Sequence, residues 1–222
     1  MIHTLSTTHS TPSFQSHVTL LTKLASTASL LSDLQTTLTE WKKTQTSSDL
    51  LLSFEGLGSH ASSQNYFQYL FAIINLSPQL ASLRQSTRSS LHSEEKRQEE
   101  DDYFPHLSLM YGLDDENKNS KEIITSLEQG GECGMTDEGY EVSSRREFVV
   151  EEVWAVRCIG KVEDWEVLGW FENQVTTHLP IQPADHGHRY ILRIVPYPGP
   201  TLLSTDGYQK ETRTILIGIR IH

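Results

Sequence analysis

Cysteine is nearly absent from this chain of 222 residues, which contains only Cys133 and Cys158. The two residues are far apart and form no C-x-x-C pair, so a structural zinc site built mainly from cysteine is excluded. A framework of disulfides is not expected either, and this favours a reducing compartment.

The sequence also lacks long apolar runs and an excess of positive charge. No apolar stretch reaches the roughly 18 residues that a membrane span needs, and the Ser- and Thr-rich start does not resemble a secretory signal. Lys and Arg total 18 against 29 Asp and Glu, which gives a formal net charge of −11. A chain this acidic, with scattered basic residues, is not expected to bind long RNA or DNA, but a small anion can still bind in a locally positive site. We expect a soluble, intracellular, cytoplasmic monomer.

Three parts of the chain differ in composition. Residues 1–13 are polar and are expected to form a loose N-terminal segment. Strand-like and helix-like patterns alternate over residues 14–168, which indicates one α+β domain, or an α/β domain as the alternative. Residues 169–222 hold five of the eight prolines and show no clear helix. We expect them to form a divergent, poorly ordered C-terminal extension that ends in a strand-like run.

Apolar periodicity predicts the individual elements of the middle part. Strands are expected at residues 14–21, 50–54, 104–111 and 162–168, and residues 147–159 are expected to form one long strand or a hairpin. Helices are expected at residues 24–43, 78–100 and 121–129. Residues 66–76 fit either a strand or a helix, and Gly56 and Gly58 indicate a turn.

Two of the predicted strands share the pattern His, apolar, Thr or Ser, apolar. The first is His17-Val18-Thr19-Leu20 and the second is His106-Leu107-Ser108-Leu109. Residues two apart on a strand point to the same side, so each strand presents an imidazole and a hydroxyl together. If the strands are neighbours, two imidazoles and two hydroxyls share one polar surface.

This set of side chains suits the hydrolysis of a phosphodiester. One imidazole can take a proton from water while the other gives a proton to the leaving oxygen, and the reference pKa near 6.5 allows both roles near neutral pH. The hydroxyls of Thr19 and Ser108 can donate hydrogen bonds to the phosphate oxygens. The arrangement needs neither a metal nor an organic cofactor.

Two other interpretations fit these residues. The chain has ten histidines and is rich in Ser and Thr, so His-x-Ser/Thr alone has little specificity, and the two strands can instead be ordinary strands that each carry a surface histidine. A metal cluster can be drawn from His178, Asp185, His186 and His188, although such runs in loops are more often solvated.

The wider sequence around both strands resembles the two-histidine phosphoesterases, and within them the fungal and plant cyclic phosphodiesterases. The resemblance is carried by Phe14-Gln15-Ser16-His17-Val18-Thr19-Leu20 and by Phe104-Pro105-His106-Leu107-Ser108-Leu109-Met110-Tyr111. A third segment, residues 160–168, is similar to the closing strand of the family. Together the similar region covers roughly residues 14–168.

The resemblance implies two pseudo-symmetric lobes of small antiparallel sheets with outer helices around a central cleft. Family members begin with a strand and a helix ahead of the first motif, and these are expected to be missing here. Members are sometimes associated with the Golgi.

The resemblance also implies hydrolysis of 2',3'-cyclic nucleotides to 2'-phosphates, and of ADP-ribose 1'',2''-cyclic phosphate, a by-product of tRNA splicing, to ADP-ribose 1''-phosphate. It implies that His17 and His106 are the acid–base pair and that Thr19 and Ser108 bind the phosphate. It makes Tyr111 a candidate nucleoside contact, with a core aromatic as the alternative. Two further alternatives are an RNA 3'-end phosphodiesterase and an inactive protein that binds nucleotides or a protein partner.

Overall fold

A computed structural model describes residues 1–24, 27–47, 49–60, 66–92, 103–112, 119–172 and 214–220. The helices are α1 (Ile2–His9), α2 (Leu30–Thr44), α3 (Pro78–Leu91) and α5 (Ser120–Gln129), and η1 (Tyr66–Gln68) and η2 (Val162–Asp164) are 3-10 turns. The strands are β1 (His17–Leu24), β2 (Leu51–Gly58), β3 (Leu70–Ile74), β4 (His106–Met110), β5 (Cys133–Thr136), β6 (Gly139–Val142), β7 (Glu147–Val149), β8 (Glu152–Cys158), β9 (Glu166–Glu172) and β10 (Thr214–Arg220).

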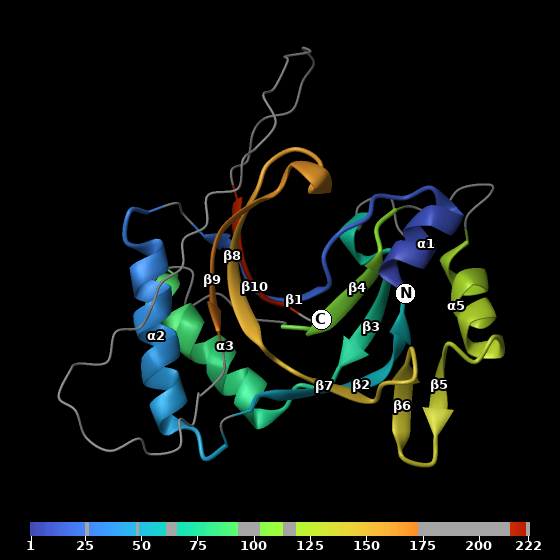
Figure 1. The fold of residues 1–222 in the computed structure, drawn as a ribbon, viewed down its shortest axis with the longest axis horizontal. Coiled ribbons are helices and arrows are strands. Elements are labelled where there is room, and N and C mark those ends of the chain that lie inside the picture. The colour runs from blue at the N-terminus through green and yellow to red at the C-terminus, as the bar shows by residue number, and fades with distance from the viewer. Residues whose placement is uncertain are drawn as a thin grey trace, which may run out of the picture.

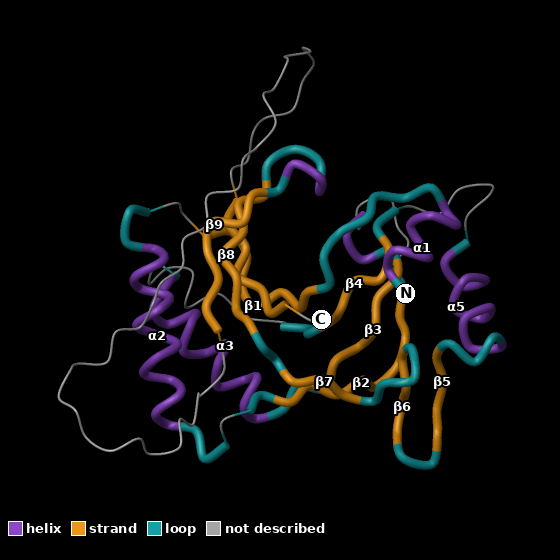
Figure 2. Tube along the Cα trace, in the orientation of Figure 1, coloured by secondary structure: helices purple, strands orange, loops and turns teal. Residues whose placement is uncertain are grey.

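Eight strands form one antiparallel sheet in the order β7-β2-β3-β4-β1-β10-β8-β9, and β5 and β6 form a separate hairpin. The large sheet curls into an arc (Figure 2). Helices α2 and α3 lie outside the half formed by β1, β10, β8 and β9, while α1 and α5 lie beside the half formed by β4, β3 and β2 (Figure 1). The architecture confirms the predicted α+β class, and the two halves meet where β1 pairs with β4.

Alternate residues of the central strands build the core between the sheet and the helices. Val18, Leu107 and Ile217 are buried and belong to one cluster with buried leucines of the helices, among them Leu34 and Leu80. Because side chains alternate along a strand, the neighbours of these residues point to the concave side of the arc. The core thus fixes which residues that side presents.

The N-terminal residues fold into a helix ahead of the first motif. The predictions of a loose segment over residues 1–13 and of a missing helix there are therefore both wrong. Helix α1 contacts β4, and its apolar residues Ile2 and Leu5 are buried in the main core. Two apolar residues three apart are a weak signal in a sequence of serines and threonines. The helix depends on tertiary packing that local propensity does not reveal.

The segment 214–220 lies inside the sheet, which corrects the expected boundary at residue 168. Strand β9 runs on to Glu172, and β10 pairs with β1 on one side and with β8 on the other. Ile215, Ile217 and Ile219 are all at most 1% exposed. The strand-like character of this run was predicted, but its place in the centre of the domain was not. Residues 173–213 are outside the described part of the chain.

Several other boundaries differ from the prediction. Gly56 and Gly58 lie within β2 rather than in a turn, and a Cβ at Gly58 would come 2.5 Å from the Phe71 ring. Strand β1 continues to Leu24, so α2 begins only at Leu30. Helix α3 begins at Pro78, with the Ser77 hydroxyl accepting a hydrogen bond from the backbone N–H of Leu80, and ends at Leu91.

The remaining differences lie further along the chain. Residues 66–76 form η1 and β3, residues 147–159 divide into β7 and β8, and residues 162–168 give η2 before β9 begins. The hairpin of β5 and β6 was not predicted. Within the described ranges, no helix has the length and apolar character to cross a membrane.

Candidate active site

The four predicted side chains come from two neighbouring strands. Val18 of β1 is paired with Leu107 of β4 in antiparallel register, and both point into the core. The residues before and after Val18 therefore point to the concave surface, and so do the residues before and after Leu107. His17 and Thr19 therefore lie beside Ser108 and His106, with the two imidazoles diagonal to each other. The two motifs are 89 positions apart, and their convergence was expected only if the strands were neighbours, as the family resemblance implied.

The same local hydrogen bond orients both imidazoles. Nδ1 of His17 lies 2.7 Å from the carbonyl oxygen of Gln15, and Nδ1 of His106 lies 2.9 Å from the carbonyl oxygen of Phe104. A carbonyl oxygen can only accept, so Nδ1 is the donor in both rings, and Nε2 of each neutral ring is left with a lone pair. Both histidines thus have the tautomer that a general base requires.

The surroundings of the two rings favour their neutral forms. Burial lowers the pKa of His17, the hydrogen bond to Gln15 opposes this shift, and the nearby His106 adds to it. Burial also lowers the pKa of His106, the hydrogen bond to Phe104 again opposes the shift, and His60 adds to it. An anionic ligand between the rings would stabilise the protonated form of either one.

The two hydroxyl residues differ in their environments. Ser108 is buried, and its Oγ donates a hydrogen bond to the carbonyl oxygen of Phe67 at 3.2 Å. The backbone carbonyl of Thr19 accepts a hydrogen bond from the hydroxyl of Tyr103 at 3.0 Å, which ties β1 to the segment before β4. Rotation of the Ser108 hydroxyl away from Phe67 would turn its proton toward the concave side.

Aromatic rings surround each histidine. The His106 ring lies 5.3 Å from the ring of Phe71 and 5.6 Å from the ring of Phe104, measured between centroids. The His17 ring lies 6.4 Å from both Phe14 and Trp165. These rings shield the two imidazoles from water, which accounts for the lowered pKa values.

Tyr111 belongs to the packing rather than to the accessible surface. It is 2% exposed, with its ring stacked on Phe14 at 3.9 Å and meeting Phe67 edge-on at 5.2 Å. This corresponds to the alternative of a core aromatic and leaves almost no surface for a nucleoside.

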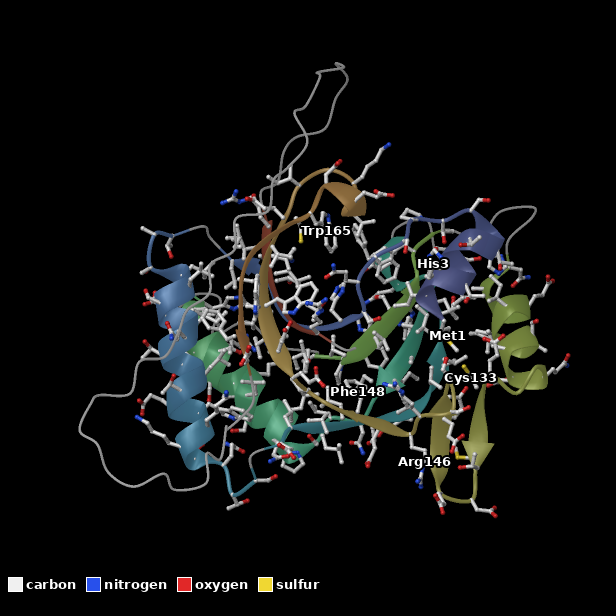
Figure 3. The ribbon with its side chains drawn as sticks, in the orientation of Figure 1. Met1, His3, Cys133, Arg146, Phe148 and Trp165 are labelled. Carbon is white, nitrogen blue, oxygen red and sulfur yellow. The ribbon has the colours of Figure 1, made fainter. Side chains whose placement is uncertain are left out.

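Two other rings occupy positions that sequence reasoning did not single out. Phe67 is 49% exposed, and its ring lies 5.7 Å from that of Trp165. Trp165 follows η2 on the open side of the arc (Figure 3). Its ring is also a neighbour of the His17 ring. Phe67 and Trp165 are the better candidates for stacking on a base, a role their type allows but their local sequence does not indicate.

No metal centre is evident among the residues that the structure describes, where no group of three His, Cys, Asp or Glu side chains converges. The candidate cluster of His178, Asp185, His186 and His188 lies outside those residues. Cys133 and Cys158 are both free, and burial raises the pKa of each thiol to about 11, so neither is poised as a nucleophile.

The chain was also compared with known proteins. No curated protein matches it. A family model described as cyclic phosphodiesterase-like protein matches residues 1–172, which include α1 and every strand of the large sheet except β10. By this match over most of its length, the chain belongs to the cyclic phosphodiesterase-like family.

Proposed function

We propose that the protein hydrolyses nucleoside 2',3'-cyclic phosphates to nucleoside 2'-phosphates without a metal ion. The observation that supports this most strongly is the pair of imidazoles on adjacent strands, each with Nδ1 held by a carbonyl oxygen two residues earlier. Two such rings can serve the entering and the leaving oxygen of one phosphorus. The family match supports cyclic phosphodiesterase activity in general.

In the proposed reaction, His106 accepts a proton from water through Nε2 while the water oxygen bonds to phosphorus. His17 takes up a proton on Nε2 when the anionic substrate binds. As the bond from phosphorus to O3' breaks, His17 gives this proton to that oxygen. The product has a 2'-phosphate and a free 3'-hydroxyl, and one proton has passed from His17 to the sugar while His106 has gained another. Solvent exchange then returns both rings to their starting states.

The hydroxyls of Thr19 and Ser108 would bind the non-bridging phosphate oxygens, where negative charge increases as water attacks. Phe67 and Trp165 would hold the base. We propose ADP-ribose 1'',2''-cyclic phosphate as a second substrate, opened to ADP-ribose 1''-phosphate by the same steps.

The test is incubation of the protein with adenosine 2',3'-cyclic phosphate in excess EDTA, with the product identified by phosphorus NMR. The expected product is 2'-AMP. Formation of 3'-AMP would contradict the proposed bond cleavage, and loss of turnover in EDTA would contradict the metal-independent mechanism. Tight binding without turnover would point to an inactive nucleotide-binding protein.

The roles of the two histidines are separable with a phosphodiester whose leaving group is 4-nitrophenolate. This leaving group needs no proton, so a variant lacking only the acid keeps its activity on it. His17→Ala is expected to retain activity on the activated diester, whereas His106→Ala is expected to lose it. The reverse result would exchange the two roles.

A further inference from the structure

Strand β10 adds a charged residue to the same surface as His17. Antiparallel pairing sets His17 of β1 opposite Arg220 of β10, and Arg220 opposite Glu152 of β8. Directly opposite residues point to the same side of a sheet, with Cβ atoms about 5 Å apart. His17, Arg220 and Glu152 therefore form a row across three strands on the concave side.

The guanidinium of Arg220 is held in a defined position. Its Nη1 donates a hydrogen bond to Oε2 of Glu152 at 3.2 Å, and the indole Nε1 of Trp154 donates to the same oxygen at 3.3 Å. The guanidinium carbon lies 4.9 Å from the centroid of the Trp154 ring. The Arg220 side chain is 34% exposed, so the group is anchored but accessible.

The next row leaves room between His17 and this guanidinium. Gly218 lies opposite Thr19 on one side and opposite Trp154 on the other. A Cβ at Gly218 would come 3.1 Å from Cδ2 of Leu216 and 3.7 Å from Cδ2 of His17. Gly218 itself adds no side chain between the His17 ring and the Trp154 ring, and Leu216 on the same face borders this position.

Its contacts with Glu152 and Trp154 draw the guanidinium across β10 toward β8, away from His17. Neighbouring strands are about 4.8 Å apart, so the axes of β1 and β8 are roughly 10 Å apart. A substrate with a phosphate at each end can place one of them beside His17 and the other on the β8 side. A guanidinium presents five N–H donors in a planar fork that fits phosphate oxygens, and Glu152 takes one of them.

We propose that Arg220, supported by Trp154 and Glu152, binds a second phosphate of the substrate. The inference rests on the proposed function and specifies its substrate class: nucleoside 2',3'-cyclic phosphates that have a further phosphate, such as a 5'-phosphate. Glu152, and Glu172 opposite it on β9, keep the surroundings of Arg220 from being strongly basic. The subsite therefore suits one compact phosphate group and not a long polyanion.

The experiment compares kcat/KM for adenosine 2',3'-cyclic phosphate with kcat/KM for the same compound bearing a 5'-phosphate. The wild-type protein is expected to prefer the 5'-phosphorylated substrate by roughly 10-fold to 100-fold, the usual range for a charge-assisted hydrogen bond. Arg220→Met is expected to bring this ratio close to one. Arg220→Lys, which keeps the charge but loses the planar fork, is expected to give an intermediate ratio.

Arg157→Met is the matched control. Arg157 also makes an ion pair to the neighbouring strand, with Nη1 2.7 Å from Oε2 of Glu166, but it lies on the other face of β8 from Glu152 and Trp154. It is expected to retain the wild-type ratio. A wild-type ratio near one, or a ratio that Arg220→Met leaves unchanged, would overturn the proposal, as would equal losses on both substrates.

Failure of the proposed reaction would be visible separately, as an absence of turnover with either substrate. The subsite is then tested by binding, with calorimetry of adenosine 2'-phosphate and adenosine 2',5'-bisphosphate. Tighter binding of the bisphosphate by the wild-type protein, lost in Arg220→Met, would support the subsite. Equal affinity for the two compounds would overturn it.

Discussion

The two halves of the curled sheet present the same chemistry in different surroundings. Each half offers a histidine, a hydroxyl two residues later and a carbonyl oxygen two residues earlier that holds Nδ1. Around His106 the neighbours are the rings of Phe71, Phe104 and, beyond them, His60.

Around His17 the neighbouring strand is β10, which contributes Gly218 and Arg220. We infer that the shared groups transfer protons to and from the oxygens of one phosphate, and that the surroundings that differ select the substrate. The half with His106 is built from strands that are near one another in the sequence, whereas the half with His17 depends on a segment 200 positions away.

The largest effect on turnover is expected from removing either of the two imidazoles, which both halves of the sheet supply. His17→Ala and His106→Ala are each expected to lower kcat for adenosine 2',3'-cyclic phosphate by roughly 10²-fold to 10⁴-fold, the usual contribution of general acid–base catalysis. His3→Ala, in the exposed part of α1, is the control and is expected to behave as wild type. Near-full turnover in either site variant would remove that histidine from the mechanism.

A second experiment asks whether β10 is as much a part of the core as β4. Ile217 of β10 is 0% exposed and Leu109 of β4 is 2% exposed, so truncation of either to alanine is expected to lower the free energy of unfolding by about 2–5 kcal/mol. Leu76→Ala, at a site 46% exposed, is expected to change it by about 0.5 kcal/mol or less. Urea denaturation measures all three. If Ile217→Ala behaved like Leu76→Ala, β10 would not be packed in the sheet.

The aromatic packing around His106 is tested at two glycines of β2. A Cβ at Gly58 would come 2.5 Å from Cε2 of Phe71, the ring that packs near His106, whereas a Cβ at Gly56 would be 3.9 Å from Ile73. Gly58→Ala is expected to lower the free energy of unfolding by about 1–3 kcal/mol, as overpacking does, and to lower kcat as well. Gly56→Ala is the matched control; equal effects at both sites would contradict the described packing of Phe71.

The smallest expected effect is a shift of the pH profile. The base must be neutral, and burial lowers the pKa of both His17 and His106, so the base stays deprotonated to lower pH than a free imidazole. The acidic limb of kcat/KM is therefore expected to have its midpoint below the reference value of about 6.5. A positive charge on His106 also lowers the pKa of His17, and a positive charge on His60 also lowers the pKa of His106. A midpoint above 6.5 would show that an anionic group governs the titration instead.

The site was predictable where its signal was local. Alternation along residues 17–20 and 106–109 indicated both which residues face the core and which share the polar surface, and the β1–β4 register bears this out. Trp165 and Phe67 gave no such signal, because their position depends on how η1 and η2 meet in space.

The parts of the fold that sequence reasoning missed depend on distant pairing. The row of His17, Arg220 and Glu152 joins residues that no short pattern connects. The same holds for α1, whose two buried apolar residues pack in a core that only the contact with β4 completes. Gly58 was predicted to lie in a turn. Its actual role could not be predicted locally, because the Phe71 ring that requires a glycine there comes from the next strand.

The most direct test of the account is nitrogen NMR of the protein with ¹⁵N-labelled histidine side chains, titrated with 2'-AMP. Signals are assigned with His17→Ala and His106→Ala. In the free protein at neutral pH, both rings are expected to have a protonated Nδ1 and an unprotonated Nε2, and both Nε2 signals are expected to shift with one shared Kd. Protonated Nε2 in either neutral ring, or a response of only one histidine to the nucleotide, would contradict the claim that both imidazoles serve one phosphate.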